Sequence, residues 1–178
     1  NTDSGQVVGY VRNGIRTFKG IPYAEIRAPD GRWMRGTKVR PWSGKRSSRA
    51  AGPVCPPTAG TGGETPDELL FRSSGSQLAR TSEDCLRINV WTPGVNDGKK
   101  RPVMFWIHGG GFTAGSSQEL PSYDGENLAR NGDVVVVSIN HRLNVLGFLD
   151  LSAYGEKYKY SANLSVLDMR FALEWVKA

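Results

Sequence analysis

Residues 103–112 read VMFWIHGGGF. An unbroken apolar run, residues 103–107, is followed by His108 and three successive glycines. Such a run is typical of a strand covered on both faces of a parallel sheet. Residues 134–139, VVVVSI, form a second run of this kind. Between the two runs, residues 128–131 predict the end of a short helix with Gly132 at its C-terminal cap. Two strands joined through a helix indicate an α/β fold with a mostly parallel central sheet.

The N-terminal region predicts antiparallel strands at one edge of that sheet. Residues 6–12 and 15–19 predict two short strands, and Asn13-Gly14 between them is a strong signal for a two-residue hairpin turn. Further along, residues 86–91 alternate apolar and polar side chains, which predicts a half-buried strand. Residues 96–100 predict an exposed turn.

The last segment predicts a helix that Asn163 or Ser165 could cap. Apolar residues recur there at helical spacing, which gives the helix one apolar face: Leu167, Phe171, Ala172, Trp175 and Val176. In a parallel sheet such a helix normally leads back to another strand. We therefore expect residues 1–178 to be an incomplete domain, cut within its architecture.

Residues 29–75 are rich in Gly, Pro, Ser and Thr, and form a long stretch for a loop inside a compact domain. We expect a wrapped or partly mobile surface segment, with a brief helical turn at residues 66–70. The two cysteines, Cys55 and Cys85, permit one disulfide but do not demand it, and two buried thiols remain equally compatible with the count.

The net charge of +6 is concentrated near the N-terminus, where residues 1–50 hold 11 Lys and Arg against 3 Asp and Glu. These charges are scattered singly between Gly and Pro residues. They favour a solvated loop surface over a polyanion site, so we expect no nucleic-acid partner. The sequence has no apolar run long enough to span a membrane, which takes about 18 residues.

Three successive glycines after a buried strand have two physical uses. They let the backbone adopt positive φ, and they leave no Cβ in the path of a ligand. Backbone N–H groups on such a loop can bind a developing oxyanion. A plain tight turn is the alternative, but the preceding strand and the nearby Gly115 favour an anion-binding loop. The spacings of phosphate-binding loops, GxxxxGK[ST] and GxGxxG, are not present.

On these motifs the chain resembles the type-B carboxylesterase and lipase family, which includes the cholinesterases. The matching segments are residues 18–24 (FKGIPYA), 41–44 (PWSG), 52–56 (GPVCP), 83–93 (EDCLRINVWTP), 108–112 (HGGGF) with Gly115-Ser116, 123–125 (YDG), 140–143 (NHRL) and 146–149 (LGFL). The resemblance covers essentially all of the chain but only the opening part of the family's catalytic domain. It implies an α/β-hydrolase fold, with residues 1–178 as the N-terminal part of a single domain.

The resemblance also implies roles for individual residues. Gly110 and Gly111 would be the two oxyanion-hole donors on this segment, and Gly109 and Phe112 would line the substrate site. Cys55 and Cys85 would form the family's first disulfide. Arg142 and Asp168 would form a buried structural ion pair.

The implied activity is carboxylic ester hydrolysis on a small-molecule substrate, through a Ser-His-acid triad and without a cofactor or metal. No G-x-S-x-G segment occurs in the sequence, so we expect the triad to lie beyond residue 178, in a C-terminal part that partners this one. We expect structural roles for His108 and His141, the only two histidines. The alternative is a non-catalytic adhesion protein on the same fold, although adhesion has no need of the HGGGF loop. A disulfide would favour a secreted or extracellular protein over a cytoplasmic one.

Two residues depart from the family pattern. Asn144 stands where the family usually has Gly, and Asn tolerates the left-handed backbone region that a Gly turn uses. Ser165 also stands where the family usually has Gly, which leaves open how tightly the last helix packs near that point.

Overall fold

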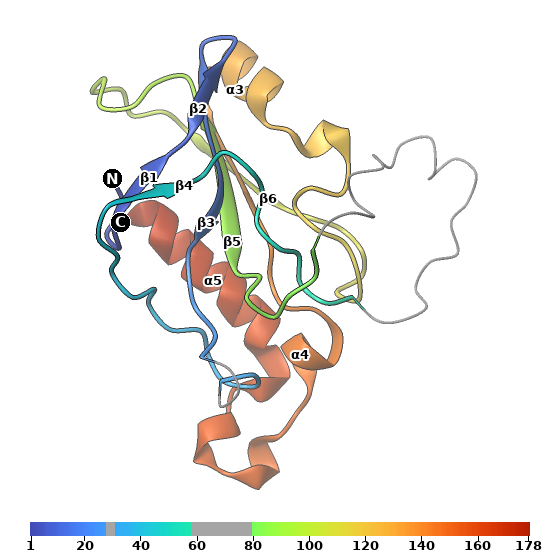
Figure 1. The fold of residues 1–178 in the computed structure, drawn as a ribbon. Coiled ribbons are helices and arrows are strands. Elements are labelled where there is room, and N and C mark those ends of the chain that lie inside the picture. The colour runs from blue at the N-terminus through green and yellow to red at the C-terminus, as the bar shows by residue number, and fades with distance from the viewer. Residues whose placement is uncertain (28–30, 58–79) are drawn as a thin grey trace, which may run out of the picture.

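A computed structural model of the chain describes residues 1–27, 31–57 and 80–178. The strands are β1 (Gln6–Val8), β2 (Tyr10–Arg12), β3 (Ile15–Pro22), β4 (Lys45–Ser47), β5 (Arg87–Thr92), β6 (Val103–Ile107) and β7 (Val135–Ile139). The α-helices are α3 (Glu126–Gly132), α4 (Asn144–Phe148) and α5 (Leu164–Lys177), with 3-10 turns at η1 (Pro121–Tyr123), η2 (Ser152–Tyr154), η3 (Glu156–Tyr158) and η4 (Ser161–Asn163). Five of these strands form one sheet in the order β2-β3-β5-β7-β6 (Figure 1).

The hairpin at one edge of the sheet is confirmed. Asn13 and Gly14 both have positive φ, 49° and 80°, as a tight hairpin turn of this type requires. Residues 6–12, however, do not form the single strand that we expected. The chain breaks at Gly9, where a Cβ would lie 2.1 Å from the carbonyl oxygen of Thr17. As a result β2 pairs with β3, whereas β1 pairs in parallel with β4 in a separate two-stranded sheet.

The prediction of a mostly parallel sheet is wrong for the described residues. β2 with β3, β3 with β5, and β5 with β7 are all antiparallel pairs, and only β6 with β7 is parallel. A two-residue turn makes β2 and β3 antiparallel, whereas a parallel pair needs a longer crossover. The connection from β6 to β7 is such a crossover and contains α3.

β6 was expected to be covered on both faces, and the described residues do not cover it. β6 is the outermost strand of the sheet, and Val103, Met104, Trp106 and Ile107 are each 42–47% exposed. β7, which has a neighbour on each side, is buried as predicted. An apolar run identifies a strand but does not reveal which other segments cover it.

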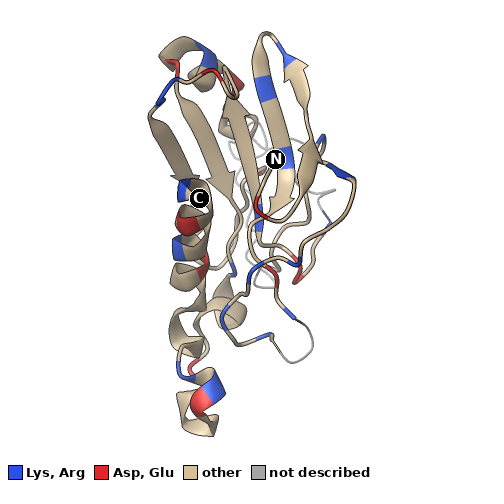
Figure 2. Cartoon of the chain, turned by 90° about the vertical axis from the view of Figure 1, so that its left-hand side faces the viewer, with Lys and Arg blue, Asp and Glu red and all other residues tan. Residues whose placement is uncertain are grey.

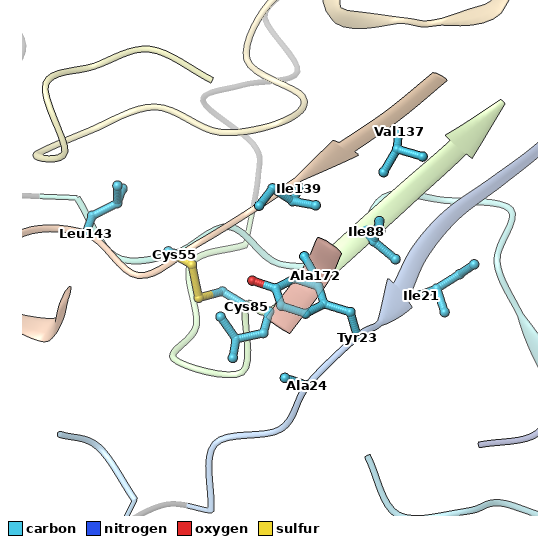
Figure 3. Packing of buried hydrophobic residues seen from close by; sticks show 11 residues of the cluster. Ile21, Tyr23, Ala24, Cys55, Cys85, Ile88, Val137, Ile139, Leu143 and Ala172 are labelled. Carbon is cyan, nitrogen blue, oxygen red and sulfur yellow. A yellow bond between two sulfur atoms is a disulfide. The ribbon is translucent and has the colours of Figure 1, made fainter. Parts of the chain in front are cut away.

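The core lies on both faces of the sheet. On the face covered by α5, the buried cluster includes Ile21, Ile88, Val137, Ile139 and Ala172 (Figure 3). On the opposite face, near α3, a smaller cluster contains Ile15, Trp91, Ala129 and Val136. β5 is therefore more buried than its alternating sequence predicts. Its polar residue Asn89 is only 3% exposed and donates hydrogen bonds to the hydroxyls of Ser117 and Ser138.

The C-terminus of α3 and the N-terminus of α5 differ in detail from the prediction. Gly132 is the last residue of α3, and Asp133 after it adopts the left-handed conformation with φ 48°. Asp133 tolerates this region, and its carboxylate accepts a hydrogen bond from Nε of Arg101 at 2.7 Å. Asn163 precedes α5 without a side-chain cap, whereas Ser165 is buried inside the first turn. Four residues of the predicted apolar face of α5 pack against the core: Phe171, Ala172, Trp175 and Val176. Leu167 is not part of that cluster, whereas Met169, which was not predicted, packs against it.

The disulfide between Cys55 and Cys85 is confirmed, with Cα atoms 5.0 Å apart and both residues at most 2% exposed. It joins the described range 31–57 to the residues just before β5. The helical turn expected at residues 66–70 lies outside the described residues.

Replacing Cys55 and Cys85 together with Ala is expected to lower the free energy of unfolding by about 3–4 kcal/mol, because the bond closes a 30-residue separation. Urea unfolding of the full-length protein measures this. Wild-type protein unfolded in a reducing agent provides the control and is expected to lose the same amount. Equal midpoints with and without the disulfide would contradict the expectation.

Charged residues are distributed over the hairpin, the loops and α5 (Figure 2). Basic and acidic positions are interspersed along α5, whereas the β2–β3 hairpin carries basic positions alone. Several basic side chains are paired, for example Arg101 with Asp97 and Asp133. Among the described residues, no helix combines the length and hydrophobicity needed to cross a lipid bilayer.

Candidate active site

The glycine-rich loop lies at the carboxyl edge of the parallel pair β6 and β7. Ile107, the last residue of β6, is directly opposite Ile139, the last residue of β7. The segments that follow, residues 108–117 and 140–148, are therefore brought together at one edge of the sheet. In α/β proteins ligands bind in the crevice outside the carboxyl ends of parallel strands.

The loop has a backbone conformation that glycine favours. Gly110 and Gly111 have φ of 114° and 59°, and Phe112 continues in the left-handed region at 62°. The Gly110 carbonyl oxygen accepts hydrogen bonds from the N–H groups of Thr113 (3.0 Å) and Ala114 (3.2 Å). Because the peptide unit is planar and trans, the N–H of Gly111 points away from the carbonyl of Gly110. The Gly111 N–H is thus directed away from Thr113 and Ala114.

The N–H groups of Gly110 and Gly111 have no hydrogen-bond partner within the described part of the chain, and both residues are exposed. Backbone N–H groups normally find a protein or water partner. Two successive N–H groups without one, on a loop whose conformation is fixed, can bind an anionic oxygen. Gly109 precedes them and is also exposed, with open space where a Cβ would stand.

Two glycines of this segment are sterically required. A Cβ on Gly110 would lie 2.2 Å from the carbonyl oxygen of Ala114. A Cβ on Gly115 would lie 2.3 Å from the carbonyl oxygen of Gly109 and 2.6 Å from Nδ1 of His108. The loop therefore packs against its own backbone at these two points.

Phe112 closes the loop and is 49% exposed. Its ring contacts that of Phe148 edge to face at 5.2 Å, and its carbonyl oxygen accepts a hydrogen bond from the N–H of Asn144 at 2.7 Å. Asn144 has φ 47°, which confirms that Asn preserves the left-handed turn in place of Gly. Its Nδ2 also donates to the Pro56 carbonyl at 2.8 Å, a contact that Gly could not make.

The two histidine rings stack on each other, with centroids 4.6 Å apart and planes 8° from parallel. His108 Nδ1 lies 2.8 Å from the carbonyl oxygen of Gly109, so the ring is tied to the loop that it precedes. Burial lowers the pKa of both rings, and the neighbouring His108 contributes to bringing that of His141 to about 4. Neutral rings that pack on each other fit structural roles.

Arg142 and Asp168 form the expected buried ion pair. Arg142 Nη2 and Nε donate to the two Asp168 carboxylate oxygens at 2.6 and 2.8 Å, and the Arg142 backbone N–H donates to Oδ2 at 3.2 Å. Its Nη1 donates to the carbonyls of Met34 (2.8 Å) and Arg32 (3.2 Å). This cluster joins α5 to the end of β7 and to the N-terminal segment.

The structure also shows contacts that the sequence did not reveal. Thr113 and Ala114 hold the carbonyl of Gly110, and Ser165 reaches Nδ1 of His141 at 2.8 Å. The departure of Ser165 from the family pattern was the only signal for the second contact. Among residues 1–27, 31–57 and 80–178, no group of three His, Cys, Asp or Glu side chains could hold a metal ion.

A mixed sheet with a glycine-rich loop at the carboxyl end of a parallel strand is typical of an α/β-hydrolase type of protein. A family model described as the carboxylesterase family matches residues 1–178, and the chain belongs to that family. It is 43% identical to the para-nitrobenzyl esterase of Bacillus subtilis, over 99% of this chain and 33% of that protein.

Solved structures agree with this assignment. An esterase from Clostridium hathewayi, described as able to hydrolyse aliphatic aromatic polyesters, matches with a TM-score of 0.89 and 45% identity. A carboxylesterase from Geobacillus stearothermophilus matches with a TM-score of 0.83 and 41% identity. Each comparison covers 99% of this chain and 33% of the other. The chain therefore spans about a third of the length of the relatives that it matches.

Proposed function

We propose that the protein is a serine carboxylic ester hydrolase, and that residues 1–178 form the N-terminal part of its single α/β-hydrolase catalytic domain. The observation that carries this proposal is that Gly110 and Gly111 are exposed and that their N–H groups have no hydrogen-bond partner among the described residues, on a loop fixed by its own carbonyl contacts. Membership of the carboxylesterase family supports it.

The proposed role of this segment is to stabilise the tetrahedral oxyanion. When a serine attacks the ester carbonyl, the carbonyl oxygen gains negative charge, and this oxygen accepts hydrogen bonds from the N–H groups of Gly110 and Gly111. Gly109, which has no Cβ, leaves room for the acyl group, and the exposed ring of Phe112 forms one wall of the site. The nucleophile comes from outside these 178 residues, since no G-x-S-x-G occurs within them. The general base and its acid partner are proposed to lie there too, because His108 and His141, the only histidines, pack on each other in structural roles.

The proposed substrate is a small carboxylic ester. The names of the relatives support this class, because one is a para-nitrobenzyl esterase and another hydrolyses polyesters. The proposed partner of residues 1–178 is the remainder of the same protein. It would cover the exposed apolar side chains of β6, including Met104 and Trp106, and pair with the free edge of that strand.

Residues 1–178 expressed alone are expected to show no turnover of p-nitrophenyl acetate and to aggregate through the exposed edge of β6. The full-length protein is expected to hydrolyse the same ester. Initial rates measured beside a protein-free blank, together with size-exclusion chromatography, test both expectations. Turnover by the isolated segment, or a monodisperse monomer that melts cooperatively, would contradict them.

The non-catalytic adhesion alternative predicts that the full-length protein also fails this assay. The intact HGGGF loop favours the enzyme, since adhesion requires no oxyanion donors. For the compartment we propose a secreted or extracellular location, supported by the Cys55–Cys85 disulfide. Fractionation of the producing cells tests this, and a cytoplasmic protein with reduced thiols would contradict it.

A further inference from the structure

Ser165 lies in the first turn of α5, and its Oγ is 2.8 Å from Nδ1 of His141. The two residues are 0% and 1% exposed, so water does not compete for this hydrogen bond. One turn further along α5, the carboxylate of Asp168 is bound by Arg142, the residue after His141. The ion pair therefore holds Ser165 in a fixed place relative to the His141 ring.

The His141 ring contacts both ends of the glycine-rich loop. One face stacks on His108, which precedes the three glycines, at 4.6 Å and 8°. Phe112, which follows the glycines, meets the same ring edge to face at 6.0 Å and 63°. The position of the loop ends thus depends on the orientation of one buried ring.

The hydrogen bonds that set the orientation of the His141 ring are made at its Nδ1 side. His141 Nδ1 also lies 3.1 Å from the carbonyl oxygen of Arg142, so both hydrogen-bond contacts of the ring are made at this one nitrogen. Nε2 is buried and has no hydrogen-bond partner within the part of the chain that the structure describes. Burial keeps the ring neutral at neutral pH, since it lowers the pKa of His141 to about 4.

We propose that Ser165 and His141 are positioning residues for the oxyanion-binding loop. Ser165 fixes the rotation of the His141 ring, and the ring fixes His108 and Phe112 on either side of Gly110 and Gly111. This inference rests on the proposed function of that loop. Without the Ser165 hydroxyl, the Arg142 carbonyl is the one hydrogen-bond partner left to the ring among the described residues. The ring can then rotate about its Cβ–Cγ bond and lose the near-parallel stack on His108.

The test compares Ser165→Ala with Ser161→Ala in the full-length protein. Ser161 is a matched control because it is also 0% exposed and its hydroxyl accepts one hydrogen bond, from the N–H of Leu151 at 2.7 Å, without contact to either histidine. Ser165→Ala is expected to lower kcat for p-nitrophenyl acetate about tenfold with KM within about twofold, since small misplacements of a catalytic group are costly. Affinity for an alkyl trifluoromethyl ketone, whose adduct carries the oxyanion, should fall by a similar factor.

Ser161→Ala is expected to lower Tm as much as Ser165→Ala while leaving kcat and inhibitor affinity at the wild-type values. Hydrogen–deuterium exchange of residues 108–115 supplies a readout that needs no activity, and it should quicken in Ser165→Ala only. If Ser165→Ala matched Ser161→Ala in kcat, inhibitor affinity and exchange, the positioning role would be overturned.

A second variant, His141→Phe, keeps an aromatic ring but cannot bond to Ser165. Because both residues act through one contact, the double variant Ser165→Ala/His141→Phe should have the same kcat as the less active of the two single variants. Fully additive losses in kcat would overturn the proposal. If wild-type protein bound no inhibitor and turned over no ester, yet exchange still quickened only in Ser165→Ala, the proposed function would fail while the positioning role stood.

Discussion

Replacing Asp168 with Ala is expected to lower the free energy of unfolding of the full-length protein by about 3–5 kcal/mol, because a buried ion pair then loses one partner. Asp168 is 1% exposed and accepts three hydrogen bonds from Arg142. Without the carboxylate, the Arg142 guanidinium remains buried with a positive charge, and its remaining hydrogen-bond partners among the described residues are the carbonyls of Arg32 and Met34. The penalty is that uncompensated charge rather than the energy of the contact itself.

Urea unfolding measures the effect, and Glu174→Ala is the matched control. Glu174 pairs with Arg170 on the exposed face of the same helix at 2.9 Å, and an exposed pair of this kind contributes little. Replacing both partners, Arg142→Met with Asp168→Leu, should recover part of the loss, because it removes the buried charge as well. A shift for Asp168→Ala no larger than that for Glu174→Ala would show that the ion pair does not hold α5 to the sheet.

Replacing Gly110 with Ala is expected to lower kcat of ester hydrolysis by about 10²–10³, the range seen when one oxyanion-hole donor is removed. The added Cβ would lie 2.2 Å from the Ala114 carbonyl oxygen, and φ at 114° is unfavourable for any side chain. The loop must therefore move, and the N–H groups of Gly110 and Gly111 move with it. KM should change less than kcat, since the interaction lost belongs to the transition state.

Gly98→Ala separates backbone strain from loss of the donor. Gly98 has φ 73° in the exposed turn between β5 and β6, and a Cβ there would meet no neighbour within 4 Å. This variant should lose some stability through its positive φ but keep wild-type kcat. A kcat for Gly110→Ala within about threefold of wild type would mean that the Gly110 loop does not bind the oxyanion.

Local signals in the sequence predicted the parts of the fold that local chemistry determines. The hairpin follows from Asn13-Gly14, since few residues tolerate positive φ at two successive positions. The central strand β7 follows from its β-branched run, and α5 from its helical spacing. The ion pair of Arg142 and Asp168 came from the family resemblance rather than from spacing, because the partners are 26 positions apart.

The parts that the sequence could not predict depend on neighbours distant in the chain. The apolar run of β6 is the same whether the strand is central or at an edge, so its exposure could not be read from it. The antiparallel pairing of β5 with β7 likewise depends on the order in which strands assemble. In the candidate site, the glycines were identifiable, whereas the contact between Ser165 and His141 exists only once α5 packs beside the end of β7.

The central claim is that Gly110 and Gly111 bind the oxyanion of an ester undergoing hydrolysis. A crystal structure of the full-length protein with an alkyl trifluoromethyl ketone bound to its nucleophile tests it most directly. We expect the hemiketal oxygen to lie about 2.7–3.1 Å from the backbone nitrogens of both glycines. A hemiketal oxygen farther than about 3.5 Å from both nitrogens, beyond hydrogen-bond reach, would contradict the claim.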